Sequence, residues 1–147
     1  EVAPVSDEPH VPYLRSDADW SQNFREHQNA GRKTTWSTPP AIVSGEPLTG
    51  FQAAAAMADG TSLTSNWGSR GVEHINADIT LTLARRPVGV TVGLEASDRV
   101  EHDGIAVGTA TIFDREGRLG TTVVTAMTNT RRSVDLGSDE RARGDDV

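Results

Sequence analysis

The sequence contains no cysteine, which excludes disulfide bridges and thiolate metal sites. It also lacks any apolar run of about 18 residues, so we expect no transmembrane helix. Positive charge is scarce: the net charge is −7, and basic residues occur together only in short pairs. Nucleic-acid-binding domains usually carry a clustered basic surface, so we expect no nucleic-acid partner. The four histidines lack metal-ligand spacing, so we expect no metal site.

The two ends of the chain are rich in charge or proline and poor in apolar residues. We therefore assign residues 1–32 to a linker or N-terminal extension and residues 131–147 to a flexible charged tail. Residues 33–130 form the one domain that a chain of this length suggests. The first residues do not resemble a signal peptide and include no initiator methionine, so we expect the chain to be a fragment or a processed product.

The main helix is expected in the segment that follows residue 44. Ser44 or Gly45 can cap its start, and Pro47 is tolerated in a first turn. Apolar residues then recur at helical spacing, and the helix ends at Gly60 or continues to about Asn66. Its many alanines make the helix slim, which would let a sheet approach closely. Alanine is also the best helix former, and both explanations can hold.

The remaining pattern alternates with a period of two, which is typical of half-buried antiparallel strands. Residues 33–38 form an edge strand that ends at two prolines. After Gly71 we expect strands over residues 75–83, 88–96, 105–113 and 119–128. His102-Asp103-Gly104 and residues 114–117 are turn signals. The predicted order is an edge strand, a helix and a four-strand meander, which gives an α+β domain with the helix on one face.

Five segments carry a resemblance through their order and spacing, from about residue 36 to residue 128: Gly45-Glu46-Pro47-Leu48, Asp59-Gly60-Thr61-Ser62, Asn76-Ala77-Asp78-Ile79-Thr80, Arg85-Arg86-Pro87 and Gly104-Ile105-Ala106-Val107-Gly108. Together they resemble the acyl-CoA thioesterase II-like family of tandem hotdogs, and its C-terminal hotdog in particular.

This resemblance implies a hotdog fold, in which an antiparallel sheet wraps around a central long helix. It implies acyl-CoA as the substrate, bound at the junction with a second hotdog domain. That second domain is a missing N-terminal half or another copy in a homo-oligomer. No cofactor and no metal are implied, and we expect a cytoplasmic location.

The resemblance also implies which residues act. In the family, an Asp on the helix, a polar residue on the long strand and a Gln on the last strand orient a water and hold the thioester carbonyl. Asp59 matches the helix Asp without a gap, although a second alignment places Ala56 there. Asn76 falls at the strand position. The Gln position falls on Val124 or Thr125, of which only Thr125 can donate a hydroxyl. The candidate catalytic residues are therefore Asp59, Asn76 and Thr125.

Each candidate also has a purely structural interpretation. Asp59 precedes a glycine and can serve as a turn or capping residue, Asn76 can be a solvated residue at a strand start, and Thr125 can be an ordinary β-former. His74 shares a strand face with Asn76 and could approach the site or simply be solvated. Two functions follow: half of an acyl-CoA thioesterase that releases CoA and a fatty acid, or a catalytically degenerate hotdog for acyl-CoA binding or assembly. The absence of the Gln favours the second, whereas the presence of Asp59 and Asn76 supports the first.

Overall fold

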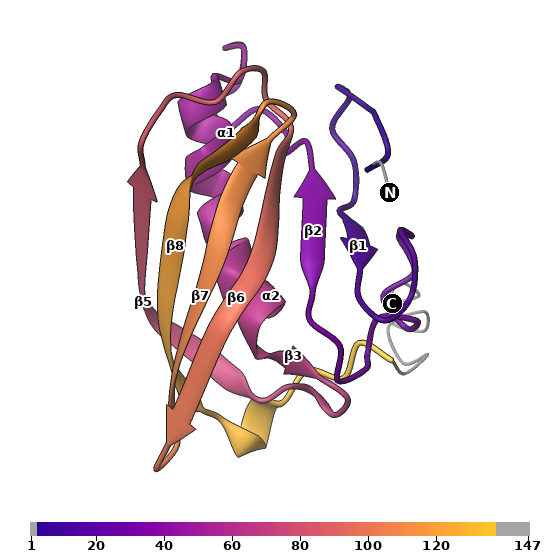
Figure 1. The fold of residues 1–147 in the computed structure, drawn as a ribbon, viewed down its shortest axis with the longest axis vertical. Coiled ribbons are helices and arrows are strands. Elements are labelled where there is room, and N and C mark those ends of the chain that lie inside the picture. Colours follow the sequence, from indigo (N-terminus) through magenta and orange to yellow (C-terminus); the bar gives the residue numbers. More distant parts are fainter. Residues whose placement is uncertain (1–2, 138–147) are drawn as a thin grey trace.

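A six-stranded antiparallel sheet in the order β1-β2-β6-β7-β8-β5 organises the computed structural model, which describes residues 3–137 (Figure 1). Its strands are β1 (Tyr13–Arg15), β2 (Thr34–Ser37), β5 (His74–Leu83), β6 (Val92–His102), β7 (Ile105–Asp114) and β8 (Gly117–Thr128). The helices are α1 (Gly50–Ala58) and α2 (Gly60–Asn66), with a short 3-10 helix η1 (Thr130–Arg132). A two-stranded hairpin of β3 (Trp67–Gly68) and β4 (Gly71–Val72) follows α2. The predicted α+β class is confirmed.

Two short helices, α1 and α2, stand where one long central helix was expected. A capping box fixes the start of α1: Gln52 N–H donates to Thr49 Oγ1 at 3.2 Å, and Thr49 N–H donates to Gln52 Oε1 at 2.9 Å. The helix therefore begins at Gly50, so Pro47 precedes it and neither Ser44 nor Gly45 caps it. Asp59 separates the two helices with φ −60° and ψ −32°, so the chain turns there without leaving helical dihedral angles.

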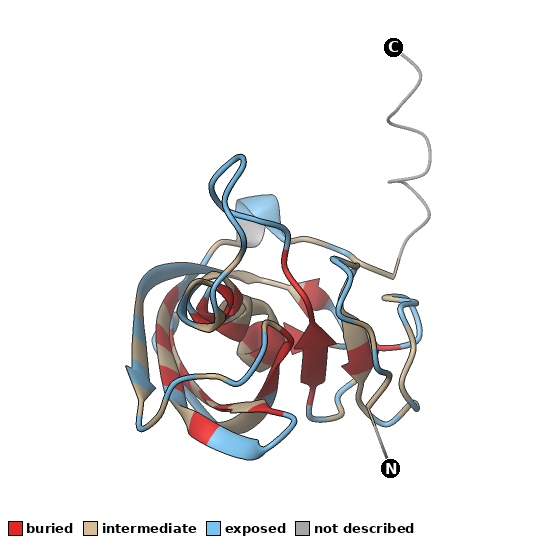
Figure 2. Ribbon diagram, turned by 90° about the horizontal axis from the view of Figure 1, so that it is seen from above, coloured by how far each residue is buried: buried red, intermediate tan, exposed pale blue. Residues whose placement is uncertain are grey.

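The helices pack into the concave face of the sheet, which curls around them (Figure 2). Ala53, Ala54 and Met57 of α1 belong to one buried cluster with residues of β6, β7 and β8: Val92, Leu94, Ala110, Ile112 and Leu119. Because the α1 side of this contact is mostly alanine, the helix lies close to the strands. Burying this apolar surface is the main source of stability for such a layer.

The contact between α2 and β7 depends on Gly108. A Cβ atom at this position would lie 2.5 Å from Ser65 Cβ, which is closer than carbon atoms can approach. Gly108 therefore allows the last turn of α2 to rest directly on the sheet.

We predict that Gly108→Ala lowers the free energy of unfolding by about 1–3 kcal/mol, because the added methyl group must push α2 away from β7. Gly68→Ala is the matched control, since no atom lies within 4 Å of the Cβ it would add. Urea unfolding of both variants measures the difference. Equal stabilities would contradict the close packing described here.

The predicted four-strand meander is wrong in one respect. Strands β6, β7 and β8 do form a meander, but β5 pairs with β8 at the far edge, with Ile79 opposite Val124. The reason is the connection between β5 and β6, residues 84–91, which is too long for a tight hairpin and carries the chain across the end of the sheet. This connection also includes part of the expected strand 88–96: β6 begins at Val92, and Val88 is 55% exposed.

An ion pair between Arg85 and Asp114 holds this connection against the β7–β8 turn. The guanidinium donates to both Asp114 oxygens, at 2.6 and 2.9 Å. Asp114 also accepts the backbone N–H groups of Val88 and Glu116, each at 2.9 Å. Burial alone would raise the pKa of the Asp114 carboxyl, but these four hydrogen bonds outweigh it and hold the pKa below the ordinary 3.8.

We predict that Asp114→Asn lowers the free energy of unfolding by about 1–3 kcal/mol near neutral pH, because the amide lacks the negative charge and has one acceptor oxygen instead of two, while solvent still reaches part of the Arg85 side chain. The folded-state pKa of Asp114 is depressed, so its stabilisation is complete above pH 4 and is lost as the pH falls through that lower value. Chemical unfolding at several pH values measures both effects. The exposed Glu46→Gln variant serves as the control. A variant as stable as the wild type at neutral pH would contradict the structural role of this pair.

Residues before and after the expected domain also contribute to the structure. β1 pairs with β2 and brings in the fully buried side chain of Leu14, although the composition of residues 1–32 gave no sign of a strand. Near the other end, Val134 forms a backbone bridge with Val72. Residues 1–2 and residues 138–147 of the expected charged tail lie outside the described residues.

Candidate functional site

Two of the three candidate residues line one groove at the junction of α1 and α2. Asp59 lies exposed between the two helices, and Asn76 lies near the start of β5. The groove has a volume of about 420 Å³. Besides Asp59 and Asn76, its lining is mainly apolar: Phe24, Leu63, Val72, Val134 and Leu136, with Gly60 and Ser62. A carboxylate and an amide therefore face the same mostly apolar space.

A β-bulge sets the direction of Asn76. The register between β5 and β8 shifts between Asn76, which lies opposite Ala126, and Asp78, which lies opposite Thr125. Ala126 is fully buried on the helix side of the sheet, so Asn76 shares that side. Bulges of this kind commonly redirect a side chain beside a functional site. Here the bulge allows Asn76 and Asp78 to point to opposite faces although they are two residues apart.

The structure does not bring Thr125 to Asp59 and Asn76. Side chains of β8 alternate, and its residues Thr122, Val124 and Ala126 are buried on the helix side. Thr125 lies on the opposite face, in register with Val107 and Asp78. Of the two positions considered for the Gln, Val124 is thus the one on the helix side, and valine has no group that can donate or accept a hydrogen bond.

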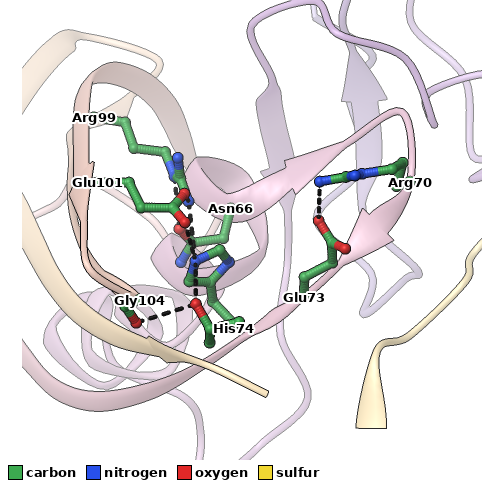
Figure 3. Close-up of polar contacts among 8 residues, drawn as sticks. Asn66, Arg70, Glu73, His74, Arg99, Glu101 and Gly104 are labelled. Carbon is green, nitrogen blue, oxygen red and sulfur yellow. Dashed lines mark hydrogen bonds and ion pairs between the residues drawn. The ribbon is translucent and has the colours of Figure 1, made fainter. Parts of the chain in front are cut away.

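A second polar cluster lies at the end of α2 (Figure 3). Arg99 Nε donates to Asn66 Oδ1 at 2.9 Å, and Arg99 Nη2 donates to Glu101 Oε2 at 2.8 Å. His74 Nε2 lies 3.3 Å from Glu101 Oε1. The hydrogen bond from Arg99 lowers the pKa of Glu101, against the opposing effect of desolvation. These four side chains come from α2, β5 and β6 and hold the ends of those elements together.

Nothing in the sequence pattern predicted a functional role for Arg99, Glu101 or Asn66. A register shift between Ala96 and Asp98 places Arg99 opposite Gly108 and Glu101 opposite Ala106, on the helix side of the sheet. The alternating pattern of residues 88–96 gave no hint of this shift. His74 was expected near Asn76, and the two residues do lie close together on β5. However, His74 lines a different pocket, together with Arg99 and Glu101.

The chain belongs to the family of acyl-CoA thioesterase C-terminal domains, whose model matches residues 3–127. The match covers most of the described chain, and the resemblance noted from the sequence is confirmed. Neither a curated protein nor a solved structure matches the chain. The family establishes a thioesterase-type hotdog domain as the class of protein.

Among the described residues 3–137, no helix is both long and apolar enough to cross a membrane. These residues also include no group of three or more His, Asp or Glu side chains arranged to hold a metal ion.

Proposed function

We propose that this domain is one half of an acyl-CoA thioesterase and hydrolyses an acyl-CoA thioester to CoA and a fatty acid. The proposal rests on one observation: Asp59 and Asn76 line the same largely apolar groove. A thioester needs an activated water, a donor for the carbonyl oxygen and a place for the acyl chain. This groove supplies a candidate for each, and the family membership points to the same chemistry.

In the proposed reaction, the Asp59 carboxylate accepts a proton from a water molecule, and the oxygen of that water attacks the carbonyl carbon of the thioester. Asn76 Nδ2 donates a hydrogen bond to the carbonyl oxygen, which becomes negatively charged in the tetrahedral intermediate. The carbon–sulfur bond then breaks, and the proton held by Asp59 passes to the leaving CoA thiolate. The first carbons of the acyl chain rest against Leu63, Val72 and Leu136.

The proposed partner is a second hotdog domain that pairs with β5. This strand stands at the end of the sheet, so one of its edges has no neighbour among residues 3–137. Unpaired strand edges are sites of further strand pairing. A partner strand there would extend the sheet. It would also cover the groove, because Asn76 of β5 lines that groove. The residues before β1 would then connect this domain to an N-terminal hotdog, and the whole enzyme would act in the cytoplasm.

The second candidate function is acyl-CoA binding or assembly without catalysis. Val124 favours it, because a valine stands on the helix side of β8 where the resemblance expects a Gln on the last strand. Asp59 and Asn76 alone would then have to hold the water and the carbonyl. The two functions differ in whether Asp59 is needed for thiol release.

We predict that Asp59→Asn lowers thioester hydrolysis by about 100-fold or more, because a general base contributes at least that factor. The measurement is thiol release from acyl-CoAs of short to long chain, by the chain assembled with its second hotdog domain. Glu46→Gln is the control, since it changes an exposed carboxylate outside the groove and should leave the rate unchanged.

Thiol release that Asp59→Asn leaves intact would exclude Asp59 as the base. If the folded wild-type assembly releases no thiol but still binds acyl-CoA, the degenerate hotdog is the correct assignment. The gain-of-function variant Val124→Gln separates these cases further: under the degenerate assignment, restoring the amide should raise the rate of thiol release in a protein that remains folded.

A further inference from the structure

A polar pocket of about 370 Å³ lies at the end of α2, beside the β3–β4 hairpin. It shares no lining residue with the groove that holds Asp59 and Asn76. A neighbouring pocket of about 340 Å³ adjoins it and shares four lining residues, Ala30, Ser65, Trp67 and Arg99. Figure 3 shows part of this region, where Asn66, His74, Arg99 and Glu101 converge. None of the steps proposed for thioester hydrolysis uses it.

Four side chains that line this pocket carry a buried polar atom without a hydrogen-bond partner among the described residues: Ser65 Oγ, Asn66 Nδ2, Trp67 Nε1 and His74 Nδ1. Buried polar groups are nearly always paired, because an unpaired one has lost its water without a replacement. Four of them around one pocket favour a ligand that brings acceptor atoms to this place.

Contacts on their other sides hold two of these groups in place. Asn66 Oδ1 accepts from Arg99 Nε, which fixes Nδ2 as the end of the amide that donates. The centroid of the Trp67 ring lies 5.5 Å from Lys33 Nζ and 5.7 Å from the centroid of the Phe24 ring. Asn66 is 7% exposed and Trp67 is 4% exposed. Their N–H groups are therefore positioned donors.

The charges around the pocket favour a ligand that brings acceptor atoms. The two acidic side chains, Glu73 and Glu101, already accept from Arg70 and Arg99, at 3.0 and 2.8 Å. The adjoining pocket adds two cations, Arg32 and Lys33, against a single acid, Asp98. The pocket thus has unpaired donors and no excess of negative charge.

We propose that this pocket binds a carboxylate. Asn66 Nδ2, Trp67 Nε1 and Ser65 Oγ donate to its two oxygens, and His74 Nδ1 adds a fourth donor in the tautomer that carries the proton on Nδ1. A carboxylate has about four acceptor positions, which matches this number of donors. The inference is independent of thioester hydrolysis, although a released fatty acid and a small metabolic acid are both possible sources of the group.

Nitrogen-15 NMR of the full chain tests the proposal, because only Trp20, Trp36 and Trp67 give indole N–H signals. The Trp67→Phe variant identifies the Trp67 signal. Acetate, butyrate and octanoate are titrated separately at constant pH and ionic strength, with butyramide and inorganic phosphate as matched comparisons. We expect saturable shifts of the Trp67 indole and Asn66 amide signals with the carboxylates only, and the chain-length preference distinguishes a fatty acid from a small acid.

Asn66→Asp keeps the oxygen that accepts from Arg99 and replaces the donor with an acceptor, so it should weaken carboxylate binding at least tenfold. The Asp59→Asn variant should bind carboxylate as the wild type does, whatever happens to its thiol release. Absence of shifts, or equal shifts with butyramide or phosphate, would overturn the proposal. Neither result would bear on Asp59, so failure here is distinguishable from failure of the proposed hydrolysis.

Discussion

Close contact between slim helices and a curved sheet is the constraint on which the rest of the structure depends. Ala53 and Ala54 let α1 lie deep against β6 and β7, and Gly108 lets the last turn of α2 rest on β7. Because the helices pack this closely against the sheet, Asp59, which separates α1 from α2, lies beside the start of β5. The same close packing brings the end of α2 within hydrogen-bond distance of Arg99. Both polar regions of the domain are therefore consequences of one packing arrangement.

Local patterns in the sequence predicted local structure well. The alternation over residues 105–113 and 119–128 corresponds to β7 and β8, and the turn at Asp103 and Gly104 has the positive φ values, 48° and 79°, that such a dipeptide favours. The neighbour of β5 was not predictable in this way, since pairing with β8 is a contact between segments far apart in sequence. The division into two helices and the strand at residues 13–15 also depend on tertiary contacts. The family resemblance captured the class of fold because it uses the order of all segments together.

For the candidate site, the sequence could name residue types but could not decide on which face of a strand each one lies. A single register shift in β5 puts Asn76 on the helix side with Asp59, whereas regular alternation in β8 puts Thr125 on the other side. A shift in β6 likewise turns Arg99 and Glu101 inward. Bulges leave little mark on a hydrophobic pattern. The polar cluster at the end of α2 was therefore visible only after the strands were paired.

The central claim is that the groove between Asp59 and Asn76 receives the thioester end of an acyl-CoA. The most direct test is binding of an unreactive acyl-CoA analogue, with a thioether in place of the thioester, to the isotope-labelled chain in its assembly. Such a ligand tests the location whether or not the domain is catalytic. Our account predicts that the largest chemical-shift changes fall on Asp59, Leu63 and Asn76, with intermolecular contacts from the carbons beside sulfur. Binding that leaves these three residues unchanged would contradict it.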